Sequence, residues 1–124
     1  MNRRYLLDTS TLIWASANSI RLPPGQAEII AAGENLVVSI VSLWEIAIKE
    51  SLGKLAIDGD IAAEVVSRGI PLIGVNLAHV ETVRRLPFHH RDPFDRMLIA
   101  QAQVENLTIL TSDGNFAAYA VELA

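Results

Sequence analysis

Apolar residues along this chain form short runs separated by polar turns. Three runs, at residues 5–7, 36–40 and 107–110, are short and bounded by polar residues, which is typical of buried β-strands. A fourth apolar run at residues 70–75 and a weak one at residues 121–123 are interpreted as strands as well. The remaining segments predict helices at residues 11–17, 26–32, 42–52, 61–67, 77–86, 93–105 and, briefly, 116–119.

Residues that favour helix ends flank several of these segments. Thr9 or Ser10 is predicted to cap the first helix and Ser42 to start the third, while Gly33 follows the second helix and Pro93 opens the sixth. Strands therefore alternate with helices along the chain. This order predicts an α/β fold of three layers, with a mostly parallel sheet between helices on both faces. The length of 124 residues predicts one domain, residues 1–124.

Composition narrows the class of protein. The chain is 51% hydrophobic and 19% charged, which predicts a folded core rather than disorder. It contains no cysteine, which excludes disulfides and thiolate metal sites and fits a reducing cytoplasm. No stretch approaches the roughly 20 apolar residues of a membrane span, so we expect an intracellular protein without a membrane partner. The net charge of −4 argues against nucleic-acid binding unless a metal offsets several acids.

Acidic residues fall where the predicted strands end. Asp8 directly follows the first strand, and Asp113 follows the last clear strand by a few residues. Glu45 and Asp95 are each expected in the first turn of a helix that can face them. Ligands bind outside the carboxyl ends of strands in parallel sheets. Four carboxylates meeting there would repel one another, and a hard cation such as Mg²⁺ or Mn²⁺ would remove that repulsion.

Each acid also has an explanation that needs no metal. Glu45 fits a capping box at the start of its helix, and Asp92 fits the cap of the helix that contains Asp95. Taken singly, capping explains Glu45 and Asp95 better, and Asp113 fits a turn equally well. Asp8 is the hardest to explain by capping, because an acid after a buried strand needs a partner. Capping and coordination are compatible, because a carboxylate has two oxygens.

Four sequence segments carry a family resemblance. They read Leu-Leu-Asp8-Thr-Ser, Ser-Leu-Trp-Glu45-Ile-Ala-Ile-Lys, His-His-Arg-Asp92-Pro-Phe-Asp95-Arg-Met-Leu-Ile-Ala-Gln-Ala and Leu-Thr-Ser-Asp113. In their order and spacing, the chain resembles the PIN-domain ribonucleases, and within them the VapC toxins of bacterial type II toxin–antitoxin systems, over essentially its whole length.

The resemblance implies a PIN-like α/β/α fold and an endoribonuclease that uses Mg²⁺ or Mn²⁺ to activate water against RNA phosphodiester bonds. It implies Asp8, Glu45, Asp95 and Asp113 as the catalytic and metal-binding residues, with Asp92 ranked below them. It further implies a homodimer and a cognate antitoxin protein as partners. Within the same family, a housekeeping nuclease of RNA processing is the alternative. A catalytically silent metal-binding or interaction domain on the same fold also stays open.

A phosphatase of the haloacid-dehalogenase type is disfavoured. That class needs a second aspartate two residues after the first, where this chain has Ser10, and a lysine before its final acids, which Asp113 lacks nearby.

Several other side chains have two interpretations. A basic cluster could grip RNA phosphates or form a solvated loop, and it comprises Arg84, Arg85, His89, His90, Arg91 and Arg96. His89 and His90 are not assigned as metal ligands, because adjacent side chains rarely point the same way. For hydroxyl groups near the acids, helix capping is favoured over contacts to carboxylates or substrate, and these are Thr9, Ser10, Thr111 and Ser112. Trp14 and Trp44 are expected to pack in the core or a dimer interface.

Overall fold

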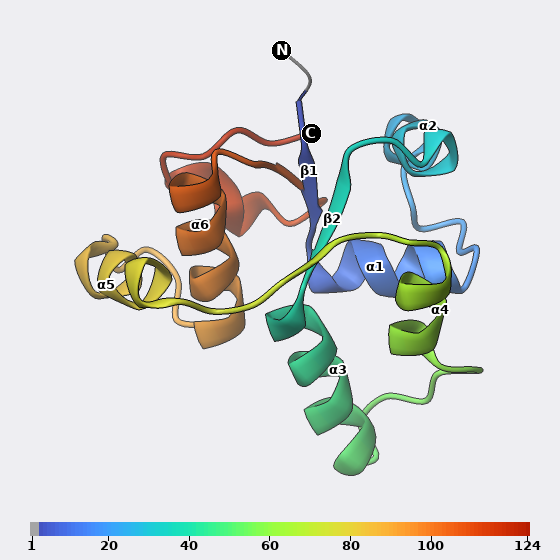
Figure 1. Ribbon diagram of the computed structural model, residues 1–124. Coiled ribbons are helices and arrows are strands. Elements are labelled where there is room, and N and C mark those ends of the chain that lie inside the picture. The colour runs from blue at the N-terminus through green and yellow to red at the C-terminus, as the bar shows by residue number, and fades with distance from the viewer. Residues whose placement is uncertain (1–2) are drawn as a thin grey trace.

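The computed structural model describes residues 3–124. Its elements alternate as the sequence predicts (Figure 1). In chain order they are β1 (Tyr5–Leu7), α1 (Thr9–Ser16), α2 (Pro24–Ala32), β2 (Leu36–Ser39), α3 (Ile40–Ser51), α4 (Ile61–Ser67), β3 (Leu72–Ile73), α5 (Leu77–Arg85), α6 (Pro93–Glu105), β4 (Thr108–Leu110) and the 3₁₀ helix η1 (Gly114–Ala118). No helix in this described part is long and apolar enough to span a membrane.

The sheet is parallel in each of its pairings and has the strand order β3-β2-β1-β4. Helices α5 and α6 lie on one side of it, and α1, α2 and α4 lie on the other (Figure 1). The predicted α/β fold with three layers is therefore confirmed. The weak strand expected at residues 121–123 is present as a single parallel bridge between Leu123 and Ile109.

Alternate residues of the strands build two apolar cores, one on each face of the sheet. Leu6 and Val37 pack with α6, whereas their neighbours Leu7 and Val38 pack with α1, α3 and α4. Successive side chains of a strand point to opposite faces, so a strand covered on both faces is apolar throughout. This explains why the strands appear in the sequence as continuous apolar runs.

Helices α1 and α3 begin earlier than predicted because their caps lie earlier. Helix α1 begins at Thr9, with Asp8 as its N-cap instead of Thr9 or Ser10. Helix α3 begins at Ile40, and the Ser39 hydroxyl accepts the Val41 amide at 3.1 Å. The prediction that Ser42 starts α3 is therefore wrong. In both cases the capping side chain belongs to the strand end, so strand and helix join without a loop.

Strand β3 is shorter than the apolar run at residues 70–75. It pairs with β2 through Val38 to Leu72 and Ser39 to Ile73. After Ser39 the chain continues as helix α3, so the residues that follow Ile73 have no neighbouring strand to pair with. The Gly74 carbonyl instead accepts the Gln101 side-chain amide at 3.1 Å, and the Gln101 carbonyl oxygen accepts the Ser39 hydroxyl at 2.6 Å. This buried polar bridge ties α6 to the carboxyl ends of β2 and β3.

Candidate metal centre

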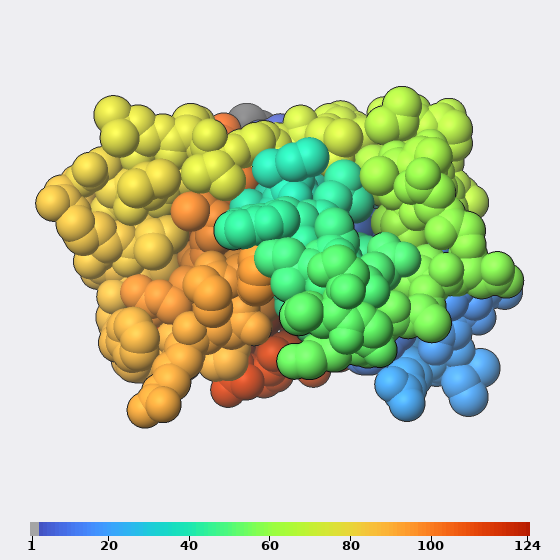
Figure 2. Space-filling model, turned by 90° about the horizontal axis from the view of Figure 1, so that it is seen from below, coloured from blue at the N-terminus to red at the C-terminus, as the bar shows by residue number. Residues whose placement is uncertain are grey.

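The carboxyl ends of β1, β2 and β4 meet on one face of the molecule, where α1 and α3 begin. Figure 2 looks onto this face, where α3 lies between the α5–α6 side and the α4–α1 side, with the segment after β4 beside it. The register places Leu7 beside Leu110, so the residues that follow these two strands are neighbours. The sheet thereby brings together residues about a hundred positions apart in the sequence.

Asp8 is buried directly after β1 and caps α1. One carboxylate oxygen accepts the Thr11 amide at 2.7 Å, and the other accepts the Thr111 hydroxyl from the end of β4. The expectation that capping explains Asp8 least well is therefore wrong. Burial raises the pKa of Asp8 and repulsion from Asp113 adds to the rise, while the hydrogen bonds from Thr111 and Thr11 oppose it.

Glu45 is buried on α3, one turn further along the helix than the sequence indicates. Its Oε1 accepts the Thr9 hydroxyl at 2.7 Å, and its Oε2 lies 3.0 Å from the Lys49 ammonium. The predicted capping box with Ser42 is wrong, because Ser39 is the cap. Glu45 therefore faces the start of α1 and is free of a capping role.

Asp92 and Asp95 divide two roles between them at the start of α6. One oxygen of Asp92 accepts the amides of Phe94 and Asp95 at 2.8 and 3.0 Å, which confirms Asp92 as the helix cap. The Asp95 carboxylate is left to face the site, where its Oδ2 lies 3.0 Å from His90 Nε2. The pKa of Asp95 is raised to about 6, mainly by burial and then by repulsion from Asp92 and Glu45, while the hydrogen bond from His90 opposes the rise.

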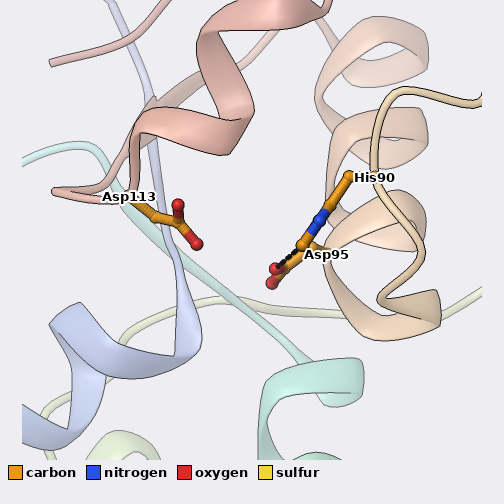
Figure 3. Close-up of side chains that lie close together, drawn as sticks. All are labelled: His90, Asp95 and Asp113. Carbon is orange, nitrogen blue, oxygen red and sulfur yellow. Dashed lines mark hydrogen bonds and ion pairs between the residues drawn. The ribbon is translucent and has the colours of Figure 1, made fainter.

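Asp113 follows β4 and caps the 3₁₀ helix. Its Oδ1 accepts the Asn115 amide at 2.9 Å, and its own amide donates to the Thr111 hydroxyl at 3.0 Å. Its carboxylate also points across the site toward Asp95 (Figure 3). Single ligand atoms of His90, Asp95 and Asp113 all lie within 4.8 Å of one another. Asp113 therefore serves as a turn residue and as part of the acidic group.

Comparison with known proteins identifies the family. The sequence-family model described as "PIN domain" matches residues 5–122 of this chain. The chain belongs to the PIN-domain family. A comparison with curated proteins gives no match.

Solved structures share this PIN fold at low sequence identity. VapBC from Salmonella typhimurium, solved bound to DNA, is 17% identical with a TM-score of 0.72, over 99% of this chain and 98% of that chain. VapBC2 from Rickettsia felis, bound to a fragment of promoter DNA, is 17% identical with a TM-score of 0.70, over 97% and 96%. VapBC-5 from Mycobacterium tuberculosis is 21% identical with a TM-score of 0.59, over 99% and 97%.

The donor set of this PIN domain suits a hard divalent cation. Two of the four predicted acids, Asp95 and Asp113, place carboxylate oxygens close together. The other two acids lie near enough to interact with them, because repulsion from Asp113 helps to raise the pKa of Asp8 and repulsion from Glu45 helps to raise the pKa of Asp95. Lys49 is the cation paired with Glu45, and it lies half exposed at the edge of the group. Carboxylate oxygens are the ligands that Mg²⁺ and Mn²⁺ prefer. Burial is the main cause of the raised pKa values of Asp8 and Asp95, and a bound cation would remove the repulsion that adds to it.

His90 is the one residue of this group that sequence reasoning set aside. His89 and His90 do point in different directions: the His89 ring packs edge-on against Tyr119 at 5.1 Å, whereas His90 faces Asp95. The two adjacent side chains therefore cannot act together as a pair of ligands, but His90 can act as a single one. His90 lies two residues before the Asp92 cap, and this position in the sequence is the signal that could have indicated its place beside Asp95.

The basic cluster is divided by the fold. Arg96 is 7% exposed, and its guanidinium donates to the Pro87 carbonyl at 2.9 Å and the Val83 carbonyl at 3.3 Å. Arg96 therefore holds the loop after α5, and neither interpretation left open for it, an RNA contact or a solvated loop, applies. Arg85 and Arg91 are exposed, as that role would require.

Two further interpretations of single side chains change. Thr9 and Thr111 donate to Glu45 and Asp8, so for these two hydroxyls the favoured capping role is wrong. Trp44 is 61% exposed and packs edge-on against Phe94 at 5.1 Å, which excludes a place in the core of this chain.

Proposed function

We propose that this PIN domain is a Mg²⁺- or Mn²⁺-dependent endoribonuclease, acting in the cytoplasm as the toxin of a toxin–antitoxin pair. The observation that carries the proposal is the meeting of Asp95 and Asp113 beside the buried Asp8 and Glu45, at the strand ends of a PIN domain. In this proposal Asp8, Glu45, Asp95 and Asp113 are the catalytic and metal-binding residues. A divalent cation held by them would supply the Lewis acidity for phosphodiester hydrolysis.

The chain's own residues prepare the site before any cation binds. Thr111 and Thr9 fix the orientation of the Asp8 and Glu45 carboxylates from two different elements. Each of these carboxylates has further lone pairs available, since one oxygen can accept more than one bond. Lys49 limits the charge that Glu45 presents. The acids are therefore held in position, which is what a precise metal site requires.

The proposed RNA contacts are electrostatic. Arg91 is exposed and lies in sequence between His90 and Asp92, beside the acidic group. It can meet a phosphate of a strand that approaches the site. Arg85 is exposed at the end of α5 and could extend this contact.

Protein partners are also part of the proposal. The structural neighbours include VapBC-5, a member of the VapBC family of toxin–antitoxin systems, and two VapBC proteins solved with DNA, which supports a cognate antitoxin. A homodimer is supported by Trp44 and Phe88, exposed by 61% and 72%, which line a mostly apolar groove of about 600 Å³ between α3, α5 and α6. Exposed apolar patches of this kind mark contact surfaces. Sedimentation of the purified protein measures whether this surface pairs with a second copy.

The nuclease proposal is tested by replacing one carboxylate oxygen of Asp8 with an amide nitrogen. Asp8→Asn keeps the N-cap, because asparagine caps helices as well as aspartate does, but it removes a charge from the site. We expect wild type to cut an RNA pool with Mg²⁺ or Mn²⁺ and not with EDTA, and the variant to lose cleavage while staying folded. The matched control is Asp58→Asn, which makes the same change at an exposed loop position.

Three outcomes separate the alternatives. If wild type, freed of any antitoxin, cuts no RNA with either metal, the nuclease proposal fails and a silent metal-binding domain is favoured. If it cuts RNA but is harmless on expression, a housekeeping nuclease is favoured. Toxicity that a neighbouring gene relieves supports the toxin.

A further inference from the structure

His90 approaches the acidic group from a segment that carries none of the four acids. Its Nε2 lies 3.0 Å from Asp95 Oδ2, and a ligand atom of Asp113 lies within 4.8 Å of both. Figure 3 shows the Asp113 carboxylate facing Asp95 and His90 from the opposite side of the site. The three residues come from the loop before α6, the first turn of α6 and the segment after β4. The fold therefore brings three donors together from three directions.

The spacing of these donors fits ligands that share one ion. Two ligand atoms at about 2.1 Å from an ion lie about 3 Å apart when adjacent and about 4.2 Å apart when opposite, in octahedral geometry. The 3.0 Å between His90 Nε2 and Asp95 Oδ2 matches adjacent ligands, and a ligand atom of Asp113 lies within 4.8 Å of both. A simple ion pair of His90 with Asp95 would explain one of these contacts. It would not involve Asp113, whose Oδ1 caps the 3₁₀ helix and whose carboxylate also faces Asp95 across the site (Figure 3).

The donors of His90, Asp95 and Asp113 are also the least engaged elsewhere. Both oxygens of Asp8 already accept bonds from Thr11 and Thr111, and both oxygens of Glu45 meet Thr9 and Lys49; these four donors come from the protein itself. In Asp113, Oδ1 accepts one backbone amide. Fewer protein bonds therefore compete with an ion on the His90 side of the site.

The backbone of His90 is held in place by a hydrogen bond to a buried tyrosine. The Tyr119 hydroxyl accepts the amides of His89 and His90 at 3.1 and 2.9 Å, and it also accepts Arg96 Nη1 at 3.2 Å. Tyr119 is 5% exposed. The buried Tyr119 hydroxyl, itself bonded to the buried Arg96 guanidinium, therefore fixes the backbone of this surface loop at His89 and His90. Hydrogen bonds of this kind hold a metal-binding side chain in position before the ion arrives.

We propose that His90 is a direct ligand of the divalent cation, so that one imidazole nitrogen joins the carboxylates. The inference rests on the metal site of the proposed function. Coordination through Nε2 places the ring proton on Nδ1, and the shared ion replaces the hydrogen bond between His90 and Asp95. Imidazole suits Mn²⁺ and later transition ions better than Mg²⁺, which prefers oxygen and water. The site therefore prefers Mn²⁺ over Mg²⁺ more strongly than a site of carboxylates alone.

The experiment measures the bound ion directly. Mn²⁺ is added to wild type, His90→Ala and His89→Ala, and pulsed electron paramagnetic resonance records the coupling of the ion to directly bound nitrogen. We expect ¹⁴N coupling in wild type and in His89→Ala, its loss in His90→Ala, and its replacement by ¹⁵N coupling after selective ¹⁵N-histidine labelling. Titration should show an affinity for Mn²⁺ about tenfold or more lower in His90→Ala, with a smaller loss for Mg²⁺.

The outcomes separate this inference from the nuclease proposal, because no RNA is needed. Bound Mn²⁺ without nitrogen coupling in wild type overturns the inference, whether or not the variants fold, and leaves the metal site standing. Equal losses of Mg²⁺ and Mn²⁺ affinity in His90→Ala also overturn it, because they show that His90 only orients Asp95. If Mn²⁺ does not bind to wild type at all, the metal site and this inference fail together. Nitrogen coupling in a protein that cuts no RNA supports the inference and refutes the nuclease.

Discussion

The charge of Asp95 destabilises the metal-free fold, and Asp95→Asn should reveal this. The side chain is 16% exposed, and its pKa rises from 3.8 to about 6 on burial beside Asp92 and Glu45. A folded-state pKa above the unfolded value means that the folded protein holds this proton more tightly. The contribution to stability is therefore complete below pH 4 and is lost as pH rises through 6.

The size of the effect follows from the shift. A difference of about two pKa units corresponds to about 3 kcal/mol of unfolding free energy, at 1.36 kcal/mol per unit. Asparagine keeps an oxygen for the bond from His90 Nε2 and carries no charge at any pH. We expect metal-free Asp95→Asn to be more stable than wild type by about 1–3 kcal/mol at pH 8 and nearly equal at pH 4. The raised pKa of Asp8 acts in the same direction and leaves both proteins some pH dependence.

Urea denaturation in EDTA at pH 4, 5, 6 and 8 measures this difference, with Asp58→Asn as the control for an exposed acid. Saturating Mn²⁺ should then stabilise wild type and Asp58→Asn but not Asp95→Asn, because a ligand stabilises only the state that binds it. A metal-free Asp95→Asn that is less stable than wild type at pH 8 would refute the reasoning. So would a pH dependence that is the same in both proteins.

Two further substitutions test the groups that hold the site. Thr111→Val keeps the shape of the side chain but removes the hydroxyl between Asp8 and the Asp113 amide, so unfolding free energy should fall by about 1–3 kcal/mol, with weaker metal binding by calorimetry. Tyr119→Phe leaves buried donors without their acceptor, which should cost about 1–3 kcal/mol and lower Mn²⁺ affinity at unchanged helical content by circular dichroism. Unchanged metal affinity in either variant would show that the hydroxyl only stabilises the fold.

The sequence predicts the fold well because each local pattern agrees with the final packing. Alternation of short apolar runs with helices is enough to predict the parallel sheet and the edge where Asp8 and Asp113 meet. Helix 93–105 is predicted to the residue, because Pro93 and Asp92 act within one turn of each other. Errors arise where a cap belongs to the preceding strand, as Ser39 does for α3, because such a residue looks like the end of an apolar run.

The site is less predictable, because it depends on side-chain direction. The sequence shows that His90 and Arg96 are basic, but not that Arg96 turns inward to bind the carbonyls of Pro87 and Val83. The same holds for Thr9, whose hydroxyl crosses to Glu45, 36 residues away. Contacts of this kind are set by the packing of α1 against α3 and of α5 against α6. No spacing within one segment records them.

Capping and the proposed metal binding are compatible uses of the same carboxylates, not rival explanations. Asp8 and Asp113 each accept a backbone amide that begins a helix, and the same anchoring fixes the direction of the remaining lone pairs. A carboxylate that is fixed by the fold loses little freedom when an ion arrives, so the helix starts help to position the donors. Asparagine separates the two uses, because it caps as well as aspartate but supplies no charge. For that reason Asp8→Asn should keep the stability of the fold and lose the metal, whereas Asp8→Ala should lose the metal and also lower the unfolding free energy by about 1–2 kcal/mol.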